Sequence, residues 1–99
     1  MYVVVSTYRA KVGEEDAIIA LHEDWQRSQD LHGKNYLSWE LLRNIELPRV
    51  FIVIAHFASK ELAQAMVNDL ARDAWYPRLV SLLEEEPTST DYVREWVAR

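Results

Sequence analysis

The sequence predicts one α+β domain over residues 1–99, whose strands and helices follow one another in the order β-α-β-β-α-β. Residues 2–9 and 50–57 are rich in β-branched and aromatic side chains, which favour strands. Other segments repeat apolar residues at helical spacing. No linker, internal repeat or low-complexity run divides the chain, so we expect a single folding unit.

The first strand is expected at residues 2–9, and a helix is expected to follow it. Gly13 opens the helical segment, and the acidic residues 14–16 in its first turn complement the helix dipole. Gly33 is expected to end the helix. The residues that recur at helical spacing, and so predict its buried face, are Ile18, Leu21, His22, Trp25 and Gln29.

Residues 35–46 alternate like a second strand, and residues 50–57 form the third. The turn at residues 46–49 contains Pro48, so we expect the two strands to form a hairpin. In the second strand the odd positions, which include Trp39 and Arg43, share one face.

A second helix is expected after Ser59, which is a good N-cap residue, with Glu61 in the first turn. A short third helix is expected to start near Pro77, since proline is tolerated in a first turn, and to stop at Pro87 after residues 84–86. Residues 90–97 are expected to form the last strand. The side chains predicted to be buried are Leu62, Ala65, Met66 and Leu70 in the second helix, and Leu79, Leu82 and Leu83 in the third.

This order is the split βαβ arrangement of ferredoxin-like folds, with both helices on one face of a four-stranded antiparallel sheet. The third strand is apolar at its odd positions, from Phe51 to Phe57, and also at the even positions Val50, Ile52 and Ile54. A strand that is apolar on both faces predicts that something else covers the second face. The simplest cover is another copy of the chain, so we expect a homodimer with His56 in the layer between the copies.

Composition narrows the possible functions. The 16 acidic residues outnumber the 11 basic ones and give a formal charge of −5, which argues against a nucleic-acid partner. The chain has no cysteine and only two glycines, so it offers no thiolate chemistry and no glycine-rich phosphate loop. No apolar run has the length of a membrane span or of a signal-peptide core, so we expect a cytoplasmic protein that does not bind membranes. We expect no metal site, because His22, Glu23 and Asp24 are adjacent and point to different faces of a helix.

Three segments carry a resemblance to a known family. Residues 8–13 lead into the acidic helix, residues 36–43 form the second strand, and residues 50–58 run into the helix start at 59–62. In these features, and nearly from end to end, the chain resembles the antibiotic biosynthesis monooxygenase family, whose fold is the dimeric α+β barrel. Members of that family oxidise quinol-like or anthrone intermediates without a cofactor, degrade haem, or isomerise small signalling molecules.

The resemblance implies the fold more than a particular reaction. Haem degraders of the family use an Asn, a Trp and a His, and by rough alignment Tyr8, Met66 and Tyr76 occupy those places in this chain. Quinone-forming members place an Asn and a Trp where this chain has Val53 and Phe57. What remains implied is a small oxygenase without a cofactor, acting on an aromatic, quinol-like or enolic molecule.

Oxygenation without a cofactor needs an apolar cavity for a flat substrate and O2, a group that helps to ionise a phenol or enol, and donors near the substrate oxygen. His22 is our candidate base and Arg43 our candidate oxyanion partner. Tyr76 and Tyr8 are candidate donors. The side chains expected to line the substrate cavity with Tyr8 are Trp25, Trp39, Met66 and Trp75.

Each candidate also has a purely structural interpretation. His22 suits a core or boundary position, Arg43 a strand-end surface position, and Met66 an adaptable core filler. Trp75 and Tyr76 could plug one end of the sheet. His32, beside Gly33, is expected to be solvated.

The alternative function is a non-catalytic dimeric module that binds an apolar small molecule or a protein partner. The enzyme hypothesis predicts an enclosed cavity between helices and sheet that at least two polar candidates reach. A space filled by Trp25, Trp39 and Met66 would contradict it.

Overall fold

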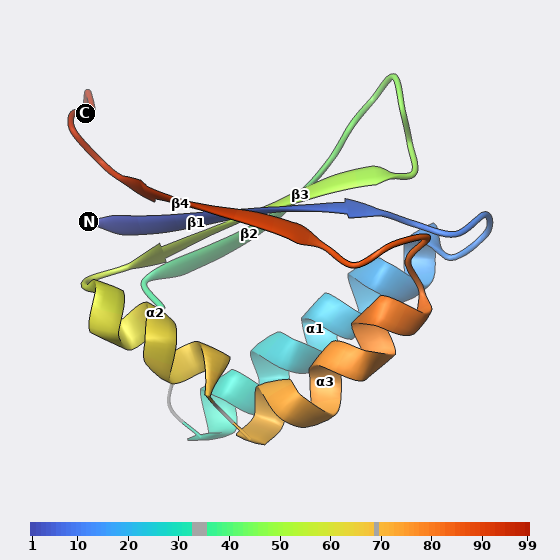
Figure 1. Cartoon of the computed structure of the whole chain (residues 1–99), viewed down its shortest axis with the longest axis horizontal. Helices are drawn as coiled ribbons and strands as arrows, with labels where there is room; N and C mark the ends of the chain where they lie inside the picture. Colours follow the sequence, from blue (N-terminus) through green and yellow to red (C-terminus); the bar gives the residue numbers. More distant parts are fainter. Residues whose placement is uncertain (33–35, 69) are drawn as a thin grey trace.

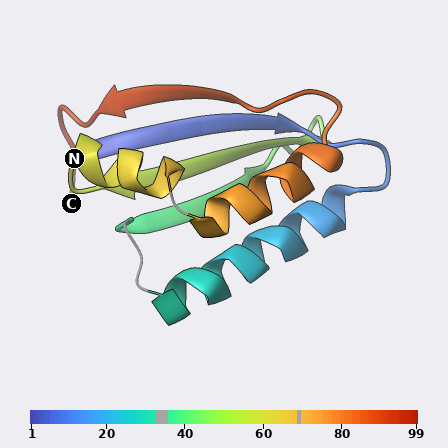
Figure 2. The same ribbon diagram turned by 60° about the horizontal axis from the view of Figure 1, so that its bottom comes forward.

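The computed structural model describes residues 1–32, 36–68 and 70–99 and contains one antiparallel sheet with helices on one of its faces (Figures 1 and 2). The strands lie side by side in the order β2-β3-β1-β4. The elements in chain order are β1 (Tyr2–Arg9), α1 (Glu15–His32), β2 (Ser38–Arg43), β3 (Val50–Phe57), α2 (Lys60–Val67), α3 (Leu70–Ser81) and β4 (Thr88–Val93). The predicted ferredoxin-like α+β fold is confirmed, with the second helical region divided into α2 and α3.

The two central strands, β1 and β3, have the predicted bounds. They pair antiparallel, with Val4 opposite Ala55 and Tyr8 opposite Phe51. The odd positions of β3 are buried beneath the helices, whereas its even positions are only half-buried. The even face carries Ile52, Ile54 and His56 and lies away from all three helices of the described chain (Figure 1).

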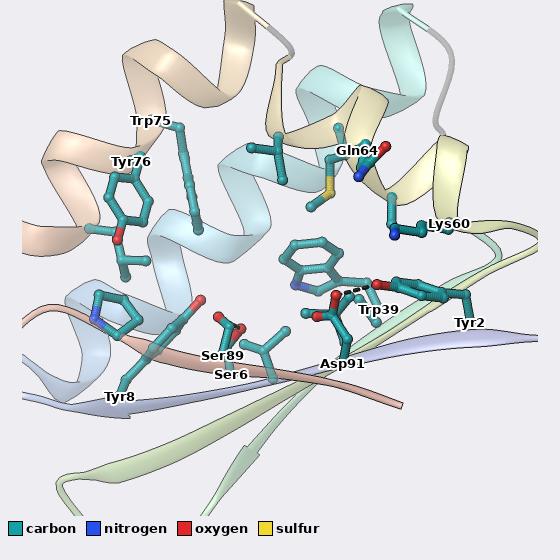
Figure 3. A pocket seen from close by; sticks show the side chains of 18 residues that line it. Tyr2, Ser6, Tyr8, Trp39, Lys60, Gln64, Trp75, Tyr76, Ser89 and Asp91 are labelled. Carbon is teal, nitrogen blue, oxygen red and sulfur yellow. Dashed lines mark hydrogen bonds between the residues drawn. The ribbon is translucent and has the colours of Figure 1, made fainter. Parts of the chain in front are cut away.

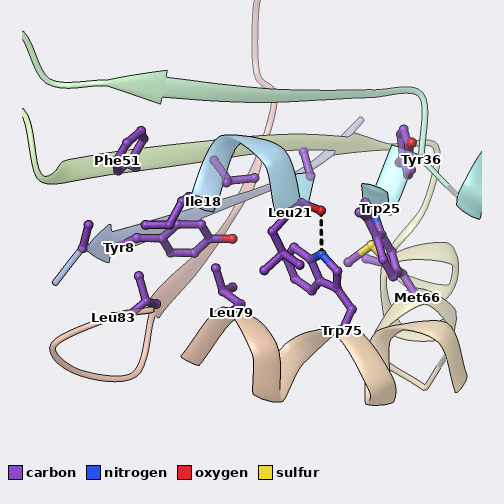
Figure 4. Packing of buried hydrophobic residues seen from close by; sticks show 14 of the residues in the cluster. Tyr8, Ile18, Leu21, Trp25, Tyr36, Phe51, Met66, Trp75, Leu79 and Leu83 are labelled. Carbon is purple, nitrogen blue, oxygen red and sulfur yellow. Dashed lines mark hydrogen bonds between the residues drawn. The ribbon is translucent and has the colours of Figure 1, made fainter. Parts of the chain in front are cut away.

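The core lies between the sheet and the helices (Figure 4). All five residues at helical spacing in α1 are buried as predicted, since none of Ile18, Leu21, His22, Trp25 and Gln29 is more than 8% exposed. The indole Nε1–H of Trp75 donates a hydrogen bond of 2.9 Å to the carbonyl of Leu21 (Figure 4). This bond fixes α3 against α1 and satisfies a buried polar group.

Gly13, in the turn before α1, has a φ of 84°, a left-handed conformation that favours glycine.

The start of α2 follows the prediction, but its buried face does not. The Ser59 side chain caps the helix by accepting a hydrogen bond of 3.2 Å from the N–H of Leu62. The buried residues are Ala63 and Met66, three positions apart on one helix face. Leu62 is 38% exposed and Ala65 is also exposed, so their predicted burial is wrong. The predicted burial of Leu70 concerns a side chain outside the described part of the structure.

The prediction that the last helix starts near Pro77 is wrong. Pro77 lies inside α3, which begins at Leu70. A proline in a helix interior costs about 3 kcal/mol. Burial of Trp75 and Leu79, 7% and 1% exposed, offsets this cost by packing the helix against the sheet and α1.

The acidic run at 84–86 does not end a helix, and Pro87 does not stop one. Helix α3 ends at Ser81, and Leu83 then forms a β-bridge with Ala10. The N–H of Glu84 donates to the carbonyl of Arg9 over 2.9 Å. The chain leaves the helix early because this pairing with the end of β1 satisfies its backbone groups.

Strands β2 and β4 also differ from their predicted bounds. In the hairpin, Asn44 Oδ1 accepts the N–H groups of Glu46 and Leu47, each at 2.9 Å, so the turn begins before residue 46. Strand β4 pairs with β1 from Thr88 to Val93, and Val93 lies opposite Tyr2, the first residue of β1. One more backbone hydrogen bond follows, from the N–H of Arg94 to the carbonyl of Met1 at 3.1 Å, and the strand ends before residue 97. The predicted helix end at Gly33 and strand start at residue 35 lie outside the described residues.

In the part of the chain that the structure describes, none of the helices has both the length and the apolar character needed to cross a bilayer.

Candidate functional site

A cavity of about 310 Å³ lies between the helix-facing side of the sheet and helices α2 and α3 (Figure 3). Alternate residues of a strand point to the same face, so β1 supplies one row of its lining. This row consists of Tyr2, Val4, Ser6 and Tyr8. Strand β4 adds Ser89 and Asp91, and the Oγ atoms of Ser6 and Ser89 lie 2.8 Å apart. The volume is at the lower end of the range for small-molecule sites.

One end of the cavity is buried and aromatic. Tyr8, Trp75 and Leu79 lie there and are at most 7% exposed. Tyr76 reaches the same end from α3, and Figure 3 shows the hydroxyl groups of Tyr8 and Tyr76 on its walls. Two of the predicted polar candidates therefore line this cavity, together with the predicted lining residues Trp39, Met66 and Trp75.

The other end of the cavity is polar and open to solvent. Lys60, Gln64 and Asp91 line it and are exposed. The hydroxyl of Tyr2 donates a hydrogen bond to Asp91 Oδ2 (Figure 3). This hydrogen bond is the main cause of a raised pKa of the Tyr2 hydroxyl, because the phenol is needed as the donor.

Trp39 forms part of the cavity wall, and His22 supports it from behind. The Trp39 Nε1–H donates a hydrogen bond of 3.2 Å to His22 Nδ1. The His22 ring stacks on Tyr8 at 5.6 Å between centroids and meets Trp75 edge-on at 5.2 Å. Trp25, which is 2% exposed, packs behind the same wall at 6.1 Å from Trp39 and 5.2 Å from Trp75.

Burial sets the protonation state of His22. It lowers the pKa of the imidazole from 6.5 to about 4, so the ring is neutral at neutral pH. Because Nδ1 accepts the Trp39 hydrogen bond, the single ring proton is on Nε2. That N–H is buried and has no hydrogen-bond partner among the described residues.

His22 and Arg43 do not line the cavity. They line a second, more open groove of about 480 Å³ between α1 and β2. Arg43 is exposed at the end of β2, where its Nε–H donates to the carbonyl of Pro48 at 2.7 Å and its guanidinium lies 5.5 Å from the centre of the Phe51 ring. The structure thus separates the three candidate catalytic residues, because only Tyr76 lies on the first cavity.

The other histidines lie elsewhere. His56 is on the face of the sheet opposite the helices, called the open face below, as its spacing predicts. Its Nδ1 lies 2.8 Å from Ser38 Oγ. The side chain of His32 lies outside the described part of the structure. No group of three or more potential metal-ligating side chains occurs among the described residues.

The polar end of the cavity was not anticipated from the sequence. Tyr2 has the same parity as Tyr8 in β1, so alternation alone could have placed it on the cavity face. Asp91 reaches the cavity only through the pairing of β4 with β1, which joins segments almost 90 residues apart. Lys60 directly follows the N-cap residue Ser59, a position that carried no functional signal.

Comparisons with known proteins agree with the predicted family resemblance in fold. No protein-family profile and no curated protein matches the sequence. Among solved structures, the chain is similar to a conserved protein of Methanosarcina mazei, with 13% identity over 95% of this chain and 92% of the other and a TM-score of 0.84. It is also similar to a proposed antibiotic biosynthesis monooxygenase of Nitrosomonas europaea, with 14% identity, 97% and 100% coverage and a TM-score of 0.82.

A third similar structure is a variant of SnoaB, a cofactor-independent oxygenase of Streptomyces nogalater, with 9% identity, 97% and 94% coverage and a TM-score of 0.82. At such identities the likeness shows the fold. The chain therefore has the fold of antibiotic biosynthesis monooxygenase structures, as the sequence predicts.

Proposed function

We propose that this chain is a small cofactor-independent oxygenase that acts on an aromatic, quinol-like or enolic molecule bound in the cavity beneath α2 and α3. The observation that carries the proposal is the combination of an aromatic cavity of about 310 Å³ with the hydroxyl-bearing side chains Tyr8 and Tyr76 at its buried end. The likeness in fold to SnoaB supports the class of reaction.

The reaction needs a substrate anion and O2. Loss of a proton gives an electron-rich phenolate or enolate, whose carbon adds O2 to form a hydroperoxide. Elimination of water from that hydroperoxide converts a ring CH2 into C=O, so one oxygen atom enters the product and the other leaves as water with two hydrogens. In this proposal Tyr8 and Tyr76 donate hydrogen bonds to a substrate oxygen at the buried end, onto which the charge of the conjugated anion is delocalised.

Oxygen consumption with a panel of anthrones and quinols tests this function. Wild-type protein is expected to accelerate O2 uptake, and Tyr76→Phe to lower kcat about tenfold or more, as the loss of a hydrogen-bond donor does. Glu85→Gln changes an exposed acidic residue outside the cavity and is expected to behave as wild type. An absence of wild-type turnover across the panel would contradict the oxygenase proposal.

The second candidate is a non-catalytic dimeric module that holds an apolar small molecule in the same cavity or binds a protein partner. The position of His22 behind the wall and of Arg43 in the other groove favours it, because neither side chain reaches the cavity. Saturable binding of an anthrone without O2 uptake would support this candidate over the oxygenase.

We further propose that the functional unit is a homodimer in the cytoplasm. The open sheet face carries Val5, Ile52 and Ile54, which are only half-buried in the single chain. Tyr92, opposite Val3 on the same face, is 53% exposed, and Trp96, beyond the end of β4, is 82% exposed. Apolar side chains of this size gain from burial, and a second copy supplies a complementary apolar surface by two-fold symmetry.

A further inference from the structure

We propose that Asp91 is the proton acceptor of this site, that Tyr2 holds its carboxylate in place, and that Lys60 supplies the positive charge that balances the substrate anion. This inference rests on the proposed function and names residues that carry out its first step. The base of the site would then lie at the open, polar end of the cavity, and the tyrosine donors at its buried end.

The register of the sheet places Asp91 on the cavity. Asp91 pairs with Val4 across β1 and β4, so it shares the helix-facing side with Val4 and with Tyr2 two positions earlier. The Tyr2 hydroxyl donates to Asp91 Oδ2, and Figure 3 shows the two side chains meeting at the wall of the cavity. Since Oδ2 receives this hydrogen bond, Oδ1 remains able to accept a proton from the substrate.

Asp91 is the suitable base among the titratable residues that line the described cavity. The others are Tyr2, Tyr8, Tyr76 and Lys60. Phenols and ammonium groups carry their protons at neutral pH and act as donors, whereas an aspartate is ionised and acts as an acceptor. His22 is separated from the cavity by Trp39 and Tyr8, so its imidazole does not reach a ligand there.

Lys60 supplies the charge that the reaction needs. It is the first residue of α2 and lines the same open end as Asp91 and Tyr2 (Figure 3). Before the reaction this end carries one carboxylate and one ammonium. After proton transfer the carboxyl group is neutral and the substrate is an anion, so the ammonium stabilises the new charge.

The step is a proton transfer. A phenolic or enolic O–H of the substrate gives its proton to Oδ1 of Asp91, the O–H bond breaks, and its electron pair remains on the substrate as phenolate or enolate. The carboxylic acid later returns the proton to the peroxide anion that forms with O2, which restores the carboxylate. The only co-reactant is molecular oxygen.

Anaerobic binding of 1,8-dihydroxyanthrone separates ionisation from oxidation, because the anion of this probe absorbs at longer wavelength than its neutral form. With wild-type protein at neutral pH the bound probe is expected to be anionic. Asp91→Asn keeps an oxygen that accepts the Tyr2 hydrogen bond but is not a base. It is expected to bind the probe with a Kd within about threefold of wild type, to slow the appearance of the anion after mixing at least about tenfold, and in air to lose at least about a hundredfold in kcat.

Tyr2→Phe tests the positioning role and provides a second variant. It is expected to lower kcat about tenfold with KM changed less than about threefold, because it affects the orientation of the base and leaves the apolar walls intact. Glu85→Gln, which removes the same charge outside the cavity, is the matched control. Melting temperatures equal to that of the wild type would show that the lower kcat of these variants does not come from loss of the fold.

Two results would overturn the inference, and they differ from each other. If the wild type oxidises the probe and Asp91→Asn does so at an equal rate, Asp91 is not the base, although the oxygenase proposal stands. If the wild type neither ionises nor oxidises any member of the anthrone and quinol panel, the proposed function fails and the inference fails with it.

Discussion

The buried imidazole of His22 is held by three aromatic side chains and is neutral. Trp39 donates to its Nδ1, the Tyr8 ring stacks on one face, and Trp75 meets it edge-on. Its ring thereby positions the wall that separates the cavity from the groove between α1 and β2. At the scale of the residue, the contribution of His22 is to support this wall.

This environment makes stability depend on pH. The pKa of His22 is about 4 in the folded chain and about 6.5 when unfolded, so between these values the unfolded state binds more protons. The stabilisation from the neutral ring is present above pH 6.5 and is lost as pH falls towards 4. The free energy of unfolding is expected to fall by on the order of 3 kcal/mol over this range. Urea unfolding at pH 7 and pH 4.5 measures it. His22→Phe is expected to show a smaller pH dependence than wild type, and an identical dependence would contradict this assignment.

Helix α3 shows at the scale of the element how packing overrides local preference. Pro77 removes one backbone donor from the helix interior, yet the helix runs from Leu70 to Ser81. Trp75 and Leu79 on its buried side offset this cost through contacts with α1 and the sheet.

Replacing this proline is expected to stabilise the chain. Pro77→Ala restores an N–H donor and removes the ring clash, and the greater entropy of the unfolded alanine chain cancels part of the gain. The free energy of unfolding is expected to rise by about 1–2 kcal/mol in urea titrations. Pro48→Ala, in the hairpin turn, is the control and is expected to give no increase. A decrease with Pro77→Ala would show that the ring itself contributes to packing.

The sequence allows the central strands to be predicted well and the cavity only in part. Strands β1 and β3 match their predicted bounds because their β-branched residues and alternation agree with their place in the sheet. The start of α3 was missed because the local preference of proline for a first turn competes with burial of Trp75, which is a tertiary effect. The Tyr2–Asp91 pair depends on the register between β1 and β4, and no local pattern encodes it.

At the scale of the whole molecule, the helices cover one face of the sheet and leave its other face uncovered. Figure 2 shows the helices gathered on one side, while Ile52, Ile54 and His56 lie on the other face of β3. An isolated sheet with one apolar face open to water is poorly stabilised, which is the physical basis for the proposed second copy.

The homodimer has a direct test in sedimentation at micromolar concentration. Wild-type protein is expected to sediment with twice the 11.6 kDa mass of the chain. Ile54→Asp places a charge on the open face and is expected to give a folded monomer, because burial of an unpaired carboxylate between two copies is costly. Ala20→Asp, on the exposed side of α1, is the control and is expected to remain dimeric. A monomeric wild type would contradict the dimer.

The central claim is that the cavity beneath α2 and α3 binds a flat aromatic molecule, and tryptophan fluorescence tests it most directly. Trp39 and Trp75 line the cavity, so anaerobic titration with 1,8-dihydroxyanthrone is expected to quench their emission with saturation. Ala63→Leu fills space in the cavity and is expected to weaken binding at least about tenfold, whereas Ala65→Leu, on the exposed side of the same helix, is expected to bind as wild type. Equal binding by Ala63→Leu and wild type, or no saturable binding by the wild type, would contradict the account.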